Sequence, residues 1–245
     1  MRSILAYTKF ELVQAMRIPM VYVALLFLPS IGMLLFVIPA LGDDPAAAVL
    51  GTSSMCLFAA LIMCSAQYGL GIADARLKPW GGYVRTLPGG AVPKMASMLA
   101  LSMVLVVSGS LPLIGIAALG TEATISIGQI AAGLLALGVG VIPFGLLMLV
   151  IGYAVNPYMV SVVISILPIA LAYLGGYFID PATTTGFIAT VAPFTPTRGP
   201  AELVWFAIGD YPPNPVSLVT FVFWTAIFGL LALRAYRGDE GKRFR

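Results

Sequence analysis

Charge is what this sequence has least of. Only 9% of its 245 residues are Asp, Glu, Lys or Arg, whereas 60% are hydrophobic, and the mean hydropathy is +1.01. A water-soluble domain has about a quarter of its residues charged. Too few charges are therefore present to cover a surface that faces water. The composition excludes an ordinary soluble protein and predicts an integral membrane protein whose outer surface faces lipid.

Histidine is absent altogether, which removes the most common general base and metal ligand of proteins. The sequence also contains no Gly-x-x-x-x-Gly-Lys-Ser/Thr phosphate loop. No charged residue falls in the middle of an apolar run, so the carboxylate that ion-coupled carriers use is missing. We therefore predict no enzyme activity, no metal and no cofactor in this chain, and an external source of energy for any transport.

Cysteine is scarce, with Cys56 and Cys64 in the same apolar run. In a helix their Cα atoms would lie about 12 Å apart, which is farther than a disulfide can reach. We expect both residues to be small apolar packing residues with free thiols.

Long apolar runs, by contrast, are abundant. A helix that crosses a bilayer needs about 20 apolar residues, and six runs reach about this length, which predicts a single all-α membrane domain over residues 1–245. The expected crossings are residues 18–41, 46–73, 95–119, 127–155, 158–179 and 216–233. Six crossings with short turns use nearly the whole chain, so no room remains for a soluble catalytic domain.

Two segments are neither crossings nor simple turns. Residues 1–17 have one apolar and one polar helical face, which predicts a helix along the membrane interface, although they could simply be the polar lead of the first crossing. Residues 182–215 are too apolar for a free loop and too rich in Pro, Gly and Thr for a crossing. We expect short helices that dip into the membrane there, one starting near Gly199 and Pro200 and ending near Gly209.

The positive charges identify the sides of the membrane. With these six crossings, every one of the 13 Lys and Arg residues except Arg198 lies on the side of the two termini. Lys and Arg near membrane ends favour the cytoplasmic side. Both termini and the tail at 234–245 are therefore expected in the cytoplasm, with segment 182–215 outside the cell.

The longest charged interruption is the segment from Asp74 to Lys94, between the second and third crossings. It holds the cations Arg76, Lys78, Arg85 and Lys94 and the single acid Asp74. Its length exceeds what a turn requires, as the four-residue turn at 42–45 shows. We therefore predict a cytoplasmic docking surface. The alternative is that the cations only obey the orientation rule and contact anionic lipid.

Polar residues inside the crossings are the candidates for contact with a transported molecule. They are Ser53, Ser54, Gln67, Tyr153 and Tyr173. Packing or lipid-interface roles are the alternative for each of them. Prolines at 29, 39, 112, 143 and 168 permit kinks within the crossings. Small residues at four-residue spacing, such as Ser161 and Ser165, would let helices approach closely.

Taken together, these features resemble the membrane subunits of ATP-binding-cassette exporters of the second type (ABC-2 permeases), in particular bacterial drug and antibiotic exporters. The segment Asp74-x-Arg76…Gly82-Tyr83-Val84-Arg85-Thr86-Leu87-Pro88 is similar to the family's acid-x-Arg…Gly…Leu-x-x-x-Pro stretch, with Asp in place of the usual Glu. Pro193-Phe194-Thr195-Pro196, followed by Glu202-Leu203, is similar to the family's segment before the last crossing. The resemblance covers essentially the whole chain.

The resemblance implies a mechanism and partners. Two permease subunits, identical or paralogous, would pair in the lipid of a bacterial plasma membrane and bind two separate cytoplasmic ATPase subunits, which would hold ATP and Mg²⁺. The coupling contacts would come from the segment between the second and third crossings, and no nucleic acid would be involved. The residues implied are Asp74, Arg76, Gly82, Tyr83, Arg85, Leu87 and Pro88.

The exported molecule would be amphipathic or hydrophobic, such as a drug, an antibiotic or a lipid-like compound. The alternative function is that of a membrane assembly or sensory protein that does not transport, and that holds lipid or a partner with its basic segment. A third, an intramembrane enzyme, lacks polar catalytic groups in the crossings.

Overall fold

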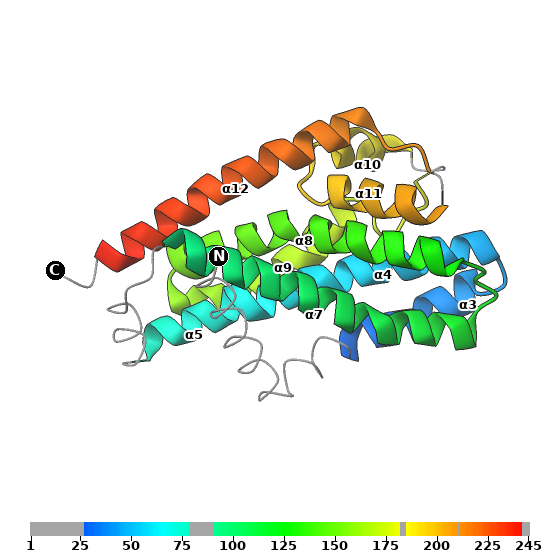
Figure 1. The fold of residues 1–245 in the computed structure, drawn as a ribbon, viewed down its shortest axis with the longest axis horizontal. Coiled ribbons are helices and arrows are strands. Elements are labelled where there is room, and N and C mark those ends of the chain that lie inside the picture. The colour runs from blue at the N-terminus through cyan, green and yellow to red at the C-terminus, as the bar shows by residue number, and fades with distance from the viewer. Residues whose placement is uncertain (1–26, 79–90, 182–184, 210, 242–245) are drawn as a thin grey trace.

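A computed structural model describes residues 27–78, 91–181, 185–209 and 211–241 of the chain (Figure 1). In these ranges the chain is almost entirely helical and contains no strand, which confirms the all-α fold. The predicted interfacial helix at residues 1–17 lies outside the described residues.

Five helices are long and apolar enough to cross a membrane: Pro45–Leu77, Val92–Gly120, Ile127–Ala154, Pro157–Leu174 and Pro215–Asp239. A shorter apolar helix, Phe27–Leu41, precedes them and ends in the π-helix η1 (Met33–Val37) and α3 (Ile38–Leu41). It is the described part of the first predicted crossing. The chain therefore has the helices of a multi-pass membrane protein.

Side chains next to prolines or in short polar turns set where the helices begin. Asp44 accepts hydrogen bonds from the first amides of α4 (Pro45–Cys64), and Pro45 occupies the first helical position. Ser126 and Gln129 form a reciprocal capping box at the start of α8 (Ile127–Ala154). Asn156 and Pro157 start α9 (Pro157–Leu174) in the same way as Asp44 and Pro45 start α4.

Three predicted boundaries next to charged residues differ from the structure. The second helix continues past residue 73 through α5 (Gly71–Leu77), so Asp74 and Arg76 are helical rather than in a loop. The segment predicted at 74–94 is also shortened from its other end, because α7 (Ala91–Gly120) already includes Lys94. The last helix, α12 (Pro215–Gly241), continues well beyond residue 233.

The fifth predicted crossing ends earlier than expected. Helix α9 stops at Leu174, and Gly175 and Gly176 follow it in a turn. Gly176 has a φ of 77°, a conformation in which a side chain would be strained. The two successive glycines are a sequence signal for the end of α9. The apolar residues that follow them favoured a longer crossing instead.

The π-helix η2 (Ser65–Leu70) lies within the long helix Pro45–Leu77 and packs closely against two neighbours. A Cβ added to Gly152 of α8 would lie 2.3 Å from the carbonyl oxygen of Tyr68, and one added to Gly69 would lie 2.8 Å from Ile164 of α9. The Tyr68 hydroxyl donates to the carbonyl of Met98 on α7. Glycine is therefore required where the widened helical turn meets α8.

Short helices occupy most of the segment predicted at 182–215: α10 (Gly186–Val191), the 3₁₀-helix η3 (Ala192–Phe194) and α11 (Arg198–Gly209). Helix α11 lies between α8 and the start of α12 (Figure 1). It approaches α8 closely at two glycines, because a Cβ on Gly133 would lie 2.6 Å from Ile208 and one on Gly140 3.1 Å from Pro200. The prediction of short helices here, one ending at Gly209, is confirmed.

The outer helices expose apolar side chains. On α9, Tyr158, Val162, Ile166, Ile169 and Tyr173 are at least half exposed and recur at helical spacing. Such a continuous apolar stripe suits lipid rather than water. Ser161 and Ser165 are also exposed, and the hydroxyl of Ser165 donates to the carbonyl of Ser161, so these serines bring none of the described helices closer.

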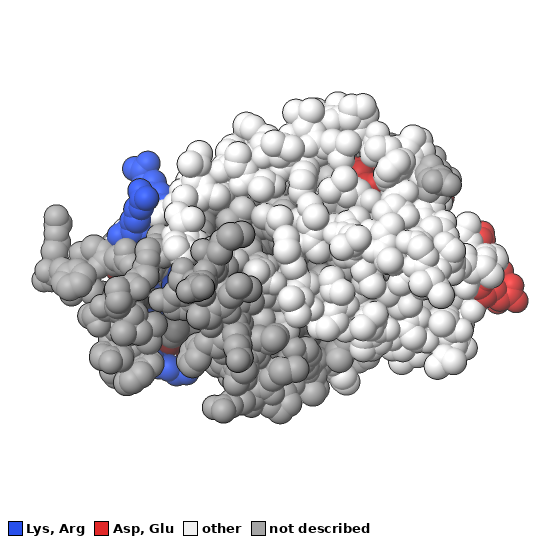
Figure 2. All heavy atoms as spheres, viewed as in Figure 1, with Lys and Arg blue, Asp and Glu red and all other residues white. Residues whose placement is uncertain are grey.

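Charge separates the two ends of the bundle (Figure 2). We call the end where α5, α8 and α12 finish and α7 begins the basic end. Its described cations are Arg76, Lys78, Lys94, Arg234 and Arg237. The opposite end is the acidic end, and its described acids are Asp43, Asp44, Glu122, Asp180 and Glu202. The sequence predicted this segregation from the alternation of apolar runs and charges.

Candidate functional site

An ion pair at the basic end joins residues far apart in the sequence. The Nε of Arg76 lies 3.1 Å from the Oδ1 of Asp239 on α12. The side chains are only 13% and 8% exposed, respectively. The Nη1 of the same guanidinium donates to the carbonyls of Gly152 and Val155, at 2.9 and 2.7 Å. A cation here satisfies carbonyls that the end of α8 leaves without helical partners.

Aromatic contacts extend this group to α7. The Nζ of Lys94 lies 5.8 Å from the ring centroid of Tyr236, within the range of a cation–π interaction. Tyr236 also meets Tyr153 of α8 edge to face, with centroids 5.2 Å apart. We call Arg76, Asp239, Lys94, Tyr236 and Tyr153 the basic-end cluster. It connects the ends of four helices. Two of them, α5 and α7, flank the predicted docking segment, and the other two are α8 and α12.

The remaining residues of the predicted docking segment divide into two groups. Asp74 on the exposed surface of α5 forms an ion pair, at 2.5 Å, with Lys78, the residue that follows the last residue of the helix. Gly82, Tyr83, Arg85, Leu87 and Pro88 lie outside the described residues. Of the two described coupling residues, Arg76 reaches other helices with its side chain, whereas Asp74 pairs with Lys78 one turn away.

A second buried ion pair lies at the acidic end, within one helix. The Nε of Arg198 lies 2.6 Å from Glu202 one turn later in α11, and the guanidinium stacks over Trp205 at 4.7 Å. Glu202 also accepts from the backbone amide of Asn214, at 3.2 Å. The pair therefore holds the start of α11 and the chain that leads into α12 in one arrangement.

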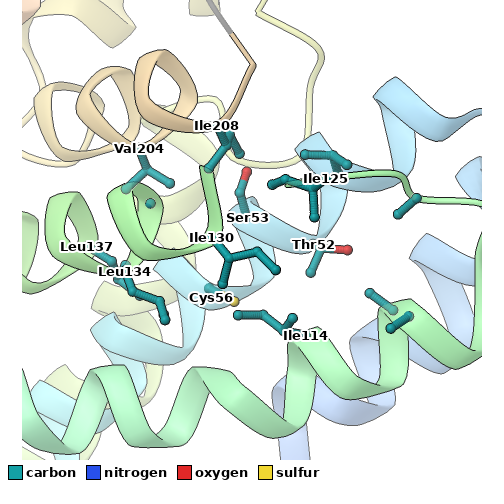
Figure 3. A pocket seen from close by; sticks show the side chains of 15 residues that line it. Thr52, Ser53, Cys56, Ile114, Ile125, Ile130, Leu134, Leu137, Val204 and Ile208 are labelled. Atoms are coloured by element: carbon teal, nitrogen blue, oxygen red, sulfur yellow. The ribbon is translucent and has the colours of Figure 1, made fainter. Parts of the chain in front are cut away.

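A pocket of about 220 Å³ lies near the acidic end between α4, α7, α8 and α11 (Figure 3). Its lining is apolar except for Thr52, Ser53 and Cys56 on α4. The two hydroxyls donate to carbonyls of their own helix, Thr52 to Ala48 and Ser53 to Leu50. The pocket can therefore accept hydrocarbon without leaving these hydroxyl protons unpaired.

The structure does not bring the five polar candidates for cargo contact together. Ser53 lines the acidic-end pocket, whereas Tyr153 belongs to the basic-end cluster. Tyr173 is 54% exposed on the outer stripe of α9. Ser54 is buried and Gln67 is half-buried in η2. These residues share polarity but not location, because they lie on four different helical elements and at different positions along them.

Sequence reasoning missed Asp239 and Lys94 as partners of the cluster, and it missed the apolar lining of the pocket. Asp239 was placed in the tail, and its only sequence signal is that it lies among cations after an apolar helix. The pocket residues Ile130, Leu137 and Ile208 carry no signal at all, because an apolar residue in an apolar helix has no distinguishing feature.

Comparisons of the chain with models of known protein families, with curated proteins and with solved structures found no match.

Proposed function

We propose that this chain is the permease subunit of an ATP-driven exporter, an ABC-2 type membrane protein. It would pair with a second permease and bind two cytoplasmic ATPase subunits. The residues that support this proposal are those of the basic-end cluster. Arg76 lies near the start of the basic segment and is bonded to the ends of α8 and α12. A partner that displaced this segment would therefore displace three spans together.

The positive charge of the basic end supports an orientation of the bundle in the membrane. Cations favour the cytoplasmic side of a bacterial plasma membrane, so we place the basic end and both termini in the cytoplasm. Residues 18–26 would complete the first of six crossings together with Phe27–Leu41. On this arrangement the acidic-end pocket opens toward the outside of the cell, in the direction of export.

The positions of the charged residues support an energy source outside this chain. Both buried ion pairs of the described residues lie toward the ends of the bundle rather than in the centre of a span. The described residues contain no cluster of His, Cys, Asp and Glu that could hold a metal ion. A proton relay or ion-coupled carrier would need titratable groups inside the spans. Energy from nucleotide hydrolysis by a partner fits this composition.

The test is co-expression of the tagged chain with a candidate ATP-binding-cassette ATPase subunit from an adjacent gene. We expect a complex in purified membranes, with ATP hydrolysis that depends on the permease. Replacing Tyr83, Arg85 and Leu87 together with alanine should keep the permease in the membrane but abolish ATP-dependent transport into inverted vesicles. A matched control replaces three exposed residues of the acidic end, Phe187, Val216 and Val219, with alanine.

Full transport by the first triple variant would remove the coupling segment from the proposal. A purified chain that retains no ATPase, or that moves solutes without one, would contradict the permease assignment. Purification of the chain without a bound ATPase would favour the alternative function, a membrane assembly or sensory protein.

A further inference from the structure

A second hollow adjoins the acidic-end pocket toward the end of the molecule. This hollow of about 260 Å³ shares Val49 and Ile208 with the pocket and extends along Pro45, Thr124 and Tyr211. The two hollows together have the size of small-molecule sites, roughly 300–1,000 Å³. At 1.5 Å per residue, Cys56 in the inner hollow lies roughly 16 Å along the helix from Pro45. The two adjoining hollows thus extend from the acidic end toward the apolar interior.

Specific contacts fix the position of α11, one wall of the pocket, against α8. The Nε2 of Gln129 donates to the carbonyl of Ile208 at 3.0 Å, and Gln129 is itself fixed by the capping box with Ser126. Gly133 allows Ile208 to approach α8, and Arg198 and Glu202 brace the other end of α11. The pocket is therefore bounded by helices whose separation is set by specific contacts.

The two turns that flank the outer hollow carry negative charge. Asp43 and Asp44 directly precede Pro45, and Glu122 is two residues before Thr124. The backbone amide of Glu122 donates to the carbonyl of Gly42 at 2.8 Å, so the two turns lie side by side. All three carboxylates are on exposed residues, and Figure 2 shows acidic side chains gathered at this end.

The described part of the chain offers no exposed cation at this end to neutralise the carboxylates. Arg198, its described cation, is buried and paired with Glu202. Like charges arranged at a mouth attract ligands of the opposite sign and repel those of the same sign. An apolar interior with an anionic mouth fits a molecule that has a hydrocarbon part and a positive group.

We infer that this cavity binds a cationic amphiphile, with the hydrocarbon part between α4, α7, α8 and α11 and the positive group at the acidic turns. As a statement about binding, the inference is independent of transport. As a statement about exported cargo, it rests on the proposed function and narrows the cargo to positively charged amphiphiles.

The experiment uses the full chain in nanodiscs of phosphatidylcholine, without any ATPase. Three photoreactive probes share one dodecyl diazirine chain and differ only in the head group, which is trimethylammonium, hydroxyl or sulfate. We expect the cationic probe to label peptides 49–56 and 130–137, which contain pocket-lining residues. Its labelling there should exceed that of the sulfate probe about tenfold, equivalent to about 1.4 kcal/mol.

Two variants locate the site. Ala118 lines the pocket but is itself exposed, so Ala118→Phe should fill the pocket without disturbing the fold, and should lower labelling by all three probes several-fold. The adjacent Leu119 is 93% exposed and does not line the pocket, so Leu119→Phe is the control and should label like the original chain.

A third variant tests the charge. Asp43→Asn combined with Glu122→Gln leaves the helix cap at Asp44 intact. It should reduce the preference for the cationic over the sulfate probe about fivefold while labelling by the hydroxyl probe stays unchanged. Equal labelling by the three head groups in the original chain, or no effect of Ala118→Phe, would overturn the inference. Because no ATPase is present, such a failure leaves the proposed exporter function to its own test.

Discussion

The two ends of the bundle each contain a buried arginine–carboxylate pair, but the pairs span very different distances along the chain. Arg198 and Glu202 are one helical turn apart, so their contact organises a single short helix. Arg76 and Asp239 are 163 residues apart and join the end of α5 to the end of α12. The same chemistry thus stabilises a local element at the acidic end and connects separate spans at the basic end.

This difference separates two roles that one residue type can have in a membrane protein. A local pair fixes shape, and here it braces one wall of a pocket. A long-range pair can couple the positions of two helix ends, because moving one end relative to the other would break the contact. This difference supports the proposal that a partner acts on the basic end and the inference that the acidic end holds a ligand.

The largest effect should follow from breaking the long-range pair. Arg76→Ala leaves Asp239 buried without its guanidinium and removes two bonds to carbonyls of α8. Removing one partner of a buried pair costs about 3–5 kcal/mol. We expect a lower unfolding temperature in detergent and loss of ATP-dependent transport.

The control for this prediction is Arg76→Lys, which keeps the charge but not the forked geometry. It should recover part of the thermal stability and little of the transport. Unchanged transport by Arg76→Ala, with lowered stability, would make the cluster a structural element only.

A smaller effect should follow from weakening the local pair. Glu202→Gln keeps the size of the side chain and removes the charge that faces Arg198. A hydrogen bond to a charged group contributes about 1.5–3 kcal/mol. We expect a matching loss of stability together with weaker probe labelling in the acidic-end pocket, and ATP hydrolysis still coupled to transport in the protein that remains folded. Uncoupled hydrolysis would mean that the two ends do not differ as described.

Packing next to the basic-end cluster offers a steric test. Gly152→Ala would place a methyl group 2.3 Å from the carbonyl oxygen of Tyr68, so the backbones of η2 and α8 must separate. Overpacking of this kind costs about 1–3 kcal/mol. Gly115→Ala is the matched control, because a Cβ there has no neighbour within 4 Å, and it should be neutral or stabilising by about 0.5–1 kcal/mol. Equal melting temperatures for the two variants would show that α8 and η2 are not closely packed.

The smallest effect is expected for the exposed pair between Asp74 and Lys78. Their side chains are 56% and 64% exposed, respectively, and exposed pairs contribute about 0.2–1 kcal/mol. Asp74→Asn should therefore leave the unfolding temperature almost unchanged. Loss of transport without loss of stability would instead support a direct contact between Asp74 and the proposed ATPase partner.

Much of the fold could be predicted because the residues that set it act locally. Asp44-Pro45, Ser126 with Gln129, and Asn156-Pro157 mark helix starts by chemistry that needs only neighbouring residues. The end of the second helix could not be placed as well. The charges Asp74 and Arg76 indicate a loop to any local reading, and they are helical because Arg76 gains distant partners on α8 and α12.

The candidate sites were less predictable than the helices. Ser53 and Tyr153 were both chosen for polarity within apolar runs, yet they lie in the acidic-end pocket and in the basic-end cluster. Hydrophobic length and charge position are properties of the chain, so the sequence alone determined the all-helical membrane class and the segregation of charge to opposite ends. The tertiary structure alone decided that Arg76 meets Asp239 and that four helices enclose a pocket, because such contacts depend on the relative rotation and separation of helices distant in the sequence.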